Sequence, residues 1–485
     1  MNQISPSDYD VVVVGAGAAG LSAALTAVEE SPGARVAVLE RATRDVRGGN
    51  TRWSGAYLRL EAPTTPVSTL VDYGMAASRG NARRDYYETL AAAVPEAFEW
   101  VQQRGVRLAQ LPTIFVTASA PRYQPIGGGR EIVEPLFAEL EKTSAVIHYE
   151  TAARRLITSS RGAITGVEVV GPDGERRVLN TRAVVLATGG FQGNPELMTR
   201  YIGRNAYRIP PISIGGGHNR GDGLLMALDA GAATDGQFDL FHAEPKDPRS
   251  SVAEAVVMTF PYGILVNNSG ERFIDEASNT VDLTYEKVAR AILEEDGSIA
   301  YAIFDQTALG IEGWEHAVKT DVAPLQADTI EELAELIGVD PATLRGTVDA
   351  YNSACPTDAS GFKVTSLDGL AAEPTAQPPK SNWSRRLEKG PFFAYPQICA
   401  NVFTFGGVRT DNEARVVDSD GHVIRGLYGA GEMTGLYFES YAGSTSVMRS
   451  ITFGRVAGRN AIREVAIKTE TNPTEPATAS PTNQL

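Results

Sequence analysis

The chain has 485 residues and carries 44 Lys and Arg against 59 Asp and Glu, a formal net charge of −15. This acidic balance argues against nucleic acid as a partner, because a phosphate backbone requires a basic field. Hydrophobic residues make up 43% of the sequence, enough to bury a sizeable core. Only two cysteines occur and the five histidines are scattered, so we expect no disulfide scaffold, no metal site and a reducing cytosol.

An uncharged apolar run extends from Val11 to Val28, and ~18 apolar residues is the lower limit for a membrane span. The ten residues before it contain no Lys or Arg, so the basic region of a secretory signal is missing. Gly15, Gly17 and Gly20 divide the run into a short β-branched block and an alanine-rich stretch. We therefore predict a strand, a turn and a helix in a cytoplasmic protein without a membrane span.

The turn itself has the pattern of a dinucleotide site. Gly15–Gly20 reads GAGAAG, a GxGxxG motif between a strand and a helix, and Glu40 ends the next predicted strand, Arg35–Glu40. The glycines let the backbone approach a pyrophosphate at the helix N-terminus, and the carboxylate can accept hydrogen bonds from ribose hydroxyls. The flanking strands and the acidic residue make this motif a strong signal.

Further glycine loops indicate a long ligand. Gly48–Thr51 exposes backbone near the same helix, Ala187–Gly190 follows a predicted strand, and Gly426–Gly431 precedes Glu432. Three separated glycine loops on one sheet require a ligand longer than a nicotinamide nucleotide, and FAD fits this requirement.

The middle of the chain differs from both ends in its residue composition. It has few glycine pairs and contains helical patterns such as Tyr285–Glu295 and Thr329–Leu336. We therefore predict an α/β fold with a Rossmann-like FAD-binding domain formed by residues 1–239 and 404–468, and an inserted α+β capping domain of residues 240–403. Residues 469–485 have the composition of a disordered tail.

Taken together, the segments GAGAAG, GGNT, ATGGF, GDGLLMAL, GERFIDE, TFGGV, GLYGAGE and ITFGRVAG resemble a known flavoprotein family. It comprises fumarate reductases, succinate dehydrogenases, tricarballylate dehydrogenase and 3-ketosteroid Δ1-dehydrogenases, and the resemblance covers residues 8 to about 465. The resemblance implies FAD contacts from Gly15, Gly17, Ala18, Ala19, Gly20, Glu40, Arg41, Gly48, Gly49, Asn50, Thr51, Ser54, Gly55, Ala153, Ala187, Thr188, Gly189, Asp222, Gly431, Glu432, Ser446 and Val447.

Two differences from other family members bear on how FAD is attached and on which molecule accepts its electrons. No histidine follows the Gly48–Gly49 pair, where covalent-flavin members carry one, so we expect noncovalent FAD. No second GxGxxG unit is present for NAD(P)H, so the resemblance implies that electrons leave to oxygen, a quinone or another acceptor.

Three positions that bind or protonate the dicarboxylate in fumarate reductases fall here on Tyr285, Phe403 and Tyr441. A dicarboxylate would lose charge-assisted hydrogen bonds worth ~1.5–3 kcal/mol each, so fumarate is a poor candidate. The replacements resemble the ketosteroid dehydrogenase branch. That resemblance implies Tyr285 as the base and Tyr441 as the group that polarises the ketone, aided by the backbone N–H near Thr445, where that branch has a glycine.

Removing an α proton and a β hydride from a ketone makes an enone, with flavin N5 as the hydride acceptor. A tyrosine of reference pKa ~10 can act as the base only if a neighbour stabilises its phenolate, and Tyr123 is our candidate. Phe403 is interpreted as a pocket wall. Arg52 and Arg449 are candidate anchors for a substrate carboxylate, although most such arginines are solvated or paired, and we assign no role to the histidines.

The predicted function is therefore FAD-dependent α,β-desaturation of a ketone substrate. We favour a small ring of the 4-oxocyclohexanecarboxylate type and keep a 3-ketosteroid as an option. A carboxylate oxidoreductase like those for fumarate or tricarballylate is an alternative. So is a flavin-binding subunit without catalytic activity.

Overall fold

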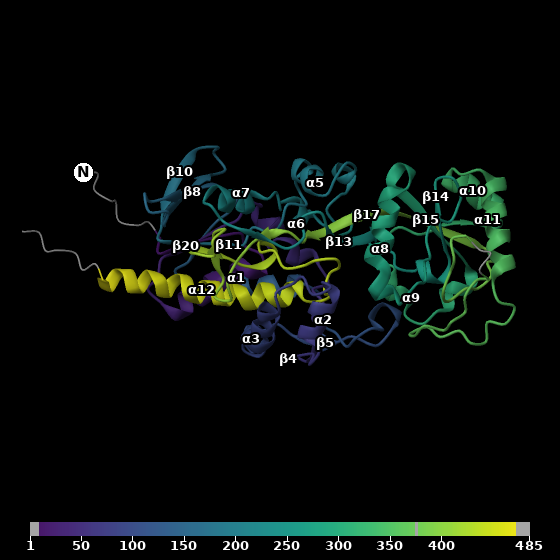
Figure 1. The fold of residues 1–485 in the computed structure, drawn as a ribbon, viewed down its shortest axis with the longest axis horizontal. Coiled ribbons are helices and arrows are strands. Elements are labelled where there is room, and N and C mark those ends of the chain that lie inside the picture. Colours follow the sequence, from purple (N-terminus) through teal and green to yellow (C-terminus); the bar gives the residue numbers. More distant parts are fainter. Residues whose placement is uncertain (1–8, 374–376, 472–485) are drawn as a thin grey trace, which may run out of the picture.

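The structure is a computed structural model that describes residues 9–373 and 377–471. Two parts lie along its long axis (Figure 1). One part, which we call the nucleotide part, is built on a six-stranded sheet, and the other, the capping part (residues 240–403), on a five-stranded sheet. The α/β fold with an inserted capping domain is confirmed, while its residue limits stay a prediction.

The six-stranded sheet has the strand order β19-β20-β11-β1-β2-β7. All neighbours pair in parallel except β19, which pairs antiparallel with β20. Its central strands are fully buried, as is typical of parallel sheets covered on both faces. The strand predicted at Val11–Val14 is confirmed. The strands are β1 (Val11–Val14), β2 (Val36–Leu39), β7 (Val146–His148), β11 (Ala183–Leu186), β19 (Arg415–Val417) and β20 (Val423–Gly429).

Helix α1 (Ala18–Glu30) lies directly against the long helix α12 (Ser446–Thr471). The two backbones approach closely because α12 presents glycines at the contact: a Cβ at Gly454 would overlap with the carbonyl oxygen of Ala19, and one at Gly458 with that of Ala23. Helix α12 reaches past residue 468, where the sequence predicts the tail to begin. The segment 472–485 lies outside the described residues.

The remaining elements of the nucleotide part surround this sheet. An antiparallel sheet, β10-β9-β8, extends from it at the end away from the capping part (Figure 1). No helix in 9–373 or 377–471 is long and apolar enough to cross a membrane. The elements are β3 (Leu60–Ala62), β4 (Thr65–Pro66), α2 (Leu70–Ala77), α3 (Arg84–Gln103), β5 (Leu108–Gln110), β6 (Tyr123–Pro125), α4 (Arg130–Leu140), β8 (Ala152–Thr158), β9 (Ile164–Val170), β10 (Arg176–Asn180), α5 (Pro195–Tyr201), α6 (Ile214–Gly217), α7 (Asp222–Asp229), β12 (Thr234–Asp235) and β18 (Gly407–Val408).

The sheet of the capping part is antiparallel, in the order β13-β17-β15-β14 with β16 paired to β17. Strands β13 and β17 connect the two parts (Figure 1). Their pairing places His242 opposite Phe403 and shifts register directly after His242, so that Val402 is an extra residue on β17. The elements are β13 (Phe241–Lys246), β14 (Ile264–Asn267), α8 (Val281–Glu294), β15 (Ile299–Asp305), α9 (Trp314–Ala317), β16 (Leu325–Ala327), α10 (Ile330–Ile337), α11 (Pro341–Ala354) and β17 (Phe392–Thr404).

Candidate functional site

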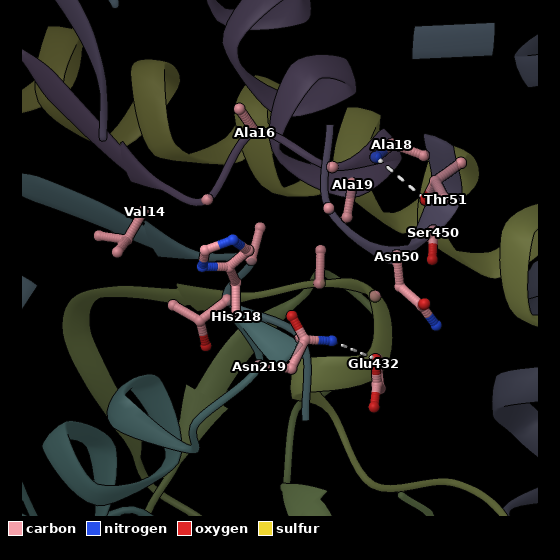
Figure 2. A pocket seen from close by; sticks show the side chains of 18 of the residues that line it. Val14, Ala16, Ala18, Ala19, Asn50, Thr51, His218, Asn219, Glu432 and Ser450 are labelled. Carbon is pink, nitrogen blue, oxygen red and sulfur yellow. Dashed lines mark hydrogen bonds between the residues drawn. The ribbon is translucent and has the colours of Figure 1, made fainter. Parts of the chain in front are cut away.

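A cavity begins at the turn between β1 and α1, which we call the nucleotide cavity. Gly15 has φ +104°, and a Cβ there would overlap with the carbonyl oxygen of Ala187. A Cβ at Gly20 would overlap with the carbonyl oxygen of Gly15, so this glycine closes the turn from behind. Ala18, at the start of α1, donates its backbone N–H to Thr51 Oγ1 at 3.5 Å (Figure 2). The turn therefore presents backbone N–H groups to a ligand at a helix N-terminus.

One end of the nucleotide cavity is formed by the acid at the end of β2. The side chain of Glu40 is buried, and burial raises the pKa of its carboxyl although backbone N–H groups stabilise the charge, one of them from Ala42 at 2.8 Å. Next to it, Arg41 forms an ion pair with Asp222 at the start of α7. Asp222 also accepts from Arg154 at 3.3 Å. Carboxylates at this end suit the hydroxyls of a ribose.

The middle of the cavity is bounded by a network around Glu432. Its Oε2 accepts from Asn219 Nδ2 at 3.0 Å, and its Oε1 accepts the backbone N–H of Thr404 at 3.1 Å. Burial raises the pKa of Glu432 to about 7, although the backbone N–H groups of Thr404 and Gly190 oppose the shift. His218 and Asn219 reach the cavity opposite Val14 (Figure 2).

The structure brings most of the predicted cofactor residues to this cavity. Gly20, Gly48 and Gly55 are the exceptions: they lie behind the wall or beside it and do not line it. Sequence reasoning missed His218 and Asn219, although both stand just before the GDGLLMAL segment that signalled this region. The predicted residues that line it are Gly15, Gly17, Ala18, Ala19, Glu40, Arg41, Gly49, Asn50, Thr51, Ser54, Ala153, Ala187, Thr188, Gly189, Asp222, Gly431, Glu432, Ser446 and Val447.

A second cavity of about 360 Å³ adjoins the first. We call it the tyrosine pocket, because Tyr285 and Tyr441 both line it. A molecule in this pocket would therefore lie against one end of a ligand in the nucleotide cavity. The residues that line both cavities are Ser54, Val402, Phe403, Ser446 and Val447.

The Tyr441 hydroxyl lies at the N-terminus of α12. It accepts the backbone N–H of Thr445 at 2.9 Å and that of Ser446 at 3.0 Å, and its own proton is directed to Ser446 Oγ at 3.0 Å. Burial raises the pKa of Tyr441, and these same donors act against the increase. Because both N–H groups donate to the hydroxyl oxygen, they make the Tyr441 O–H a stronger donor to the oxygen of a polarised carbonyl, where negative charge develops.

Tyr285 projects from α8 into the same pocket. Its hydroxyl makes no hydrogen bond to any residue of the described ranges. Burial raises the pKa of Tyr285 well above its ordinary value, and the charges of Glu286 and Glu244 raise it further. The charge of Arg122, which lines the same pocket, acts against this increase, but burial and the two carboxylates outweigh it.

The prediction that Tyr123 assists the base is not supported by its position. In a strand, alternate residues face opposite sides. Arg122 and Gln124 of the β6 segment line the tyrosine pocket, whereas Tyr123 lies between them and packs against the hydrophobic core of the nucleotide part.

The two arginine candidates also lie outside the tyrosine pocket. Arg52 Nη1 pairs with Glu134 at 2.5 Å. Arg449 is 1% exposed, lines the nucleotide cavity and donates to the backbone oxygen of Thr434 at 3.0 Å. Neither guanidinium is positioned to bind a substrate carboxylate, because each is directed to a partner elsewhere.

The Thr445 side chain turns away from the pocket as well. Its hydroxyl donates to the carbonyl oxygen of Ala442 and contacts the Tyr437 hydroxyl at 2.9 Å. Only the backbone N–H of Thr445 points to Tyr441, so this side chain takes no room beside the carbonyl site. Phe403 lies in the wall, as predicted, with its ring 4.9 Å from that of Tyr441.

The tyrosine pocket is also lined by charged side chains that we did not predict from the sequence. Arg122 pairs with Asp282 at 3.1 Å, and Lys319 pairs with Glu254 at 3.4 Å. Glu244 lines the pocket too. One signal was available on α8: Asp282 lies three residues before Tyr285, a spacing that puts both on one helix face. Lys319 comes from a loop and gave no such signal.

Histidines also reach this pocket, although the sequence assigned them no role. The His242 ring lies between the two tyrosines, with centroids 4.5 Å from Tyr441 and 5.6 Å from Tyr285. His316 lies at the pocket edge, where its side chain is 55% exposed.

One group of potential metal ligands lies at the surface, in the turn between β19 and β20. It consists of Asp418, Asp420 and His422. Asp418 Oδ1 accepts the backbone N–H groups of Asp420 at 3.0 Å and of His422 at 2.8 Å. These hydrogen bonds stabilise the turn and explain why the three side chains lie close together.

Comparison with known proteins matches this architecture to one family. Residues 10–446 match the family described as "FAD binding domain". The glycine turn, the buried acid at the end of β2 and the family match fit FAD, which is therefore the cofactor of this chain.

Two relatives and one solved structure illustrate the range of this family. A fumarate reductase (cytochrome) of Shewanella frigidimarina is 29% identical over 95% of this chain and 78% of its own length. A 4-oxocyclohexanecarboxylate 2-dehydrogenase of Sinomonas cyclohexanicum is 29% identical over 95% of this chain and 94% of its own. The structure of a 3-ketosteroid-Δ4-(5α)-dehydrogenase from Rhodococcus jostii RHA1 superposes with a TM-score of 0.70 at 25% identity, covering 95% of this chain and 98% of that one.

Proposed function

We propose that this chain desaturates a ketone. The premise is that the chain belongs to the FAD-binding family of the fumarate reductase and succinate dehydrogenase flavoproteins. The reaction removes a proton from the carbon α to the carbonyl and a hydride from the β carbon. Bound FAD supplies the hydride acceptor of this reaction.

The observation that carries the proposal is the donor arrangement at Tyr441. Its hydroxyl and the N–H groups of Thr445 and Ser446 converge at the start of α12, in a pocket that adjoins the nucleotide cavity. A ketone oxygen bound here could accept from the Tyr441 hydroxyl, which the two N–H groups polarise, and this hydrogen bond would strengthen as enolate charge develops. The proposal thus rests on a hydroxyl donor whose own oxygen is held by two backbone N–H groups.

Tyr285 is the proposed base. It lines the same pocket as Tyr441, and its hydroxyl is free to face a substrate. Because its pKa is raised well above the ordinary value, it would react as a neutral phenol that gains the substrate proton while losing its own. The base role therefore requires a second group that accepts the phenol proton.

Two features support a cyclic ketone of modest size. The pocket volume of about 360 Å³ lies near the lower end of the range for small-molecule sites, about 300–1,000 Å³. The relative from Sinomonas cyclohexanicum is a 4-oxocyclohexanecarboxylate 2-dehydrogenase, which names a ring that bears both a ketone and a carboxylate. Arg122 and Lys319 are the cations that could attract such a carboxylate, although each has an acidic partner.

A second candidate function is oxidation or reduction of a carboxylate substrate. The observation that favours it is the presence of Arg122, Lys319 and His242 in the pocket wall. The fumarate reductase among the relatives points the same way. The same cations are already paired, however, and a dicarboxylate would have to compete with Asp282 and Glu254 for them.

The test uses Tyr285→Phe and Tyr441→Phe, with Tyr301→Phe as the matched control, because Tyr301 lies on β15 outside the pocket. Cyclic ketones, with and without a carboxylate, are mixed anaerobically with each flavin-loaded protein while the flavin absorbance is followed. Loss of the base or of the carbonyl donor should slow bleaching about 100-fold or more without loss of FAD, whereas the control should react like wild type.

Ordinary bleaching in Tyr285→Phe would remove this residue from the mechanism. Bleaching of the wild type by polycarboxylates, but by none of the ketones, would favour the second candidate function.

A further inference from the structure

Glu244 is a carboxyl group in the tyrosine pocket that the proposed function does not yet use. It lies on β13 and its side chain is 15% exposed. Its Oε2 atom is buried and has no hydrogen-bond partner among the described residues. Its Oε1 atom lies 3.7 Å from His242 Nε2. A buried carboxyl oxygen without a partner costs free energy, which makes a purely structural role a poor explanation.

The orientation of the His242 ring is set by a hydrogen bond at Nδ1, the nitrogen that faces away from Glu244. Its Nδ1 lies 2.8 Å from Glu286 Oε1, and Glu286 Oε2 accepts the backbone N–H of Tyr441 at 3.1 Å. Burial alone would raise the pKa of Glu286, but the hydrogen bond and charge of His242 and the charge of Arg290 hold it below the ordinary value. An ionised Glu286 keeps the proton on Nδ1, so Nε2, which faces Glu244, is the nitrogen that can gain or lose one.

The pair of His242 and Glu244 is also adjacent to both tyrosines. The His242 ring packs against Tyr441 and Tyr285, and the charge of Glu244 is close enough to Tyr285 to raise the pKa of that phenol. The two side chains project from one strand, separated by a single residue. They therefore line the same pocket as both phenols, with the His242 ring in contact with each.

We propose that His242 and Glu244 share one exchangeable proton and serve as the proton acceptor behind Tyr285, with Glu286 as the residue that positions the imidazole. This inference rests on the proposed function and extends it. As the α C–H bond breaks, its proton forms a new O–H bond with Tyr285, whose former proton passes to the His242–Glu244 pair. The β hydride carries the electron pair to FAD, so the substrate is oxidised and the protein gains one proton.

Burial and the neighbouring charges bring the pKa of Glu244 into the range that this proton transfer needs. Burial raises the pKa of Glu244 to about 7, and Glu254 adds to the increase, while His242 and Lys319 oppose it. Glu286 on α8 acts in the same direction as Glu254. A group with this pKa can accept a proton at neutral pH and release it afterwards to solvent.

The kinetic test compares Glu244→Gln with Glu295→Gln in the flavin-loaded enzyme. Glu295 is a half-buried glutamate at the end of α8 that does not line the pocket. In wild type, the rate of flavin bleaching by ketone should rise with pH through about 7, because the pair must be deprotonated to accept. Glu244→Gln should react about 100-fold more slowly and lose this rise, whereas Glu295→Gln should keep both. A wild-type pH profile in Glu244→Gln would overturn the proposal.

A second measurement does not depend on turnover. The flavin-loaded protein is labelled with ¹⁵N-histidine, and His242 is assigned by comparison with His242→Gln. We expect the Nε2 signal of His242 to report the proton exchanged with Glu244, so that its pH dependence in wild type changes in Glu244→Gln, while Nδ1 stays hydrogen-bonded to Glu286 in both. An unchanged titration in Glu244→Gln would show that no proton is shared, and would overturn the inference.

The two experiments separate the inference from the proposed function. If no ketone bleaches the wild-type flavin and the coupled titration is nevertheless observed, ketone desaturation fails while the proton-sharing pair stands. If ketones bleach the flavin but Glu244→Gln behaves as wild type in both measurements, desaturation stands and the proton pair fails.

Discussion

The nucleotide cavity and the tyrosine pocket share part of their walls but are constructed in different ways. The cavity is shaped by backbone: glycines at Gly15 and Gly20 let chain segments approach to distances that a Cβ would prevent. The pocket is shaped by side chains, among them Tyr285 from α8, His242 from β13 and Tyr441 from the turn before α12. The comparison teaches that cofactor binding depends here on local turns, whereas substrate chemistry depends on how distant elements meet.

The largest expected effect tests the backbone side of this comparison. In Gly20→Ala, the new Cβ would overlap with the carbonyl oxygen of Gly15, so the turn between β1 and α1 must move. Overpacking typically costs about 1–3 kcal/mol, and the moved N–H groups would no longer face the pyrophosphate. We expect purified Gly20→Ala to carry little or no FAD, measured by its flavin absorbance relative to protein.

Gly33→Ala is the matched control for that variant. Gly33 follows the same helix and is exposed, and a Cβ added there would meet no other atom within 4 Å. It should bind FAD as wild type does. Full FAD content in Gly20→Ala would show that the cavity tolerates side chains at its turn, and the distinction between the two sites would fail.

A smaller effect is expected from Glu432, whose hydrogen bonds bound the middle of the nucleotide cavity. Its folded-state pKa is raised to about 7, so the folded protein binds a proton that the unfolded chain, with a pKa near 4.5, releases. The contribution of this group is therefore present below pH about 4.5 and is lost as pH rises through about 7, by up to about 3 kcal/mol.

Glu432→Gln removes this titration. Measured by denaturant unfolding from about pH 5 to about pH 8, the stability of the variant relative to wild type should rise with pH and level off above about 7. Other carboxyls, including Glu244, contribute equally to both proteins and cancel in the difference. A difference that is flat with pH would show that Glu432 is ionised throughout.

The smallest effect is expected at Arg52. Its guanidinium pairs with Glu134, which also pairs with Arg47 at 3.0 Å, so Glu134 keeps a partner in Arg52→Met. We expect a stability loss of less than about 1 kcal/mol and a KM for a carboxylate-bearing ketone within about twofold of wild type. A large increase in KM with unchanged kcat would place Arg52 in substrate binding and blur the boundary between the two sites.

Much of the nucleotide part could be predicted from the sequence because its signals are local. The strand Val11–Val14, the glycine turn and the acid at Glu40 occur within one continuous segment, and the structure places them as that pattern indicates. Tyr285 and Tyr441 were predicted to share a pocket only through the family resemblance, and the structure places both there.

The remaining residues of the pocket could not be read from local patterns. Tyr123 was chosen over its neighbours, but the face that each residue of a strand presents depends on its pairing, and Arg122 and Gln124 are the ones that face the pocket. His242 and Glu244 reach the site because β13 pairs with β17, whose partner residues are far along the chain.

The amino-acid sequence by itself determined the turns that hold the dinucleotide, since a glycine without a Cβ permits a close backbone approach in almost any context. Only the tertiary structure decided which polar groups surround the substrate. Strand register and helix docking select the face that each side chain presents, and they also provide Arg52 and Arg449 with partners away from the pocket. These choices depend on contacts between distant segments, which a local pattern does not encode.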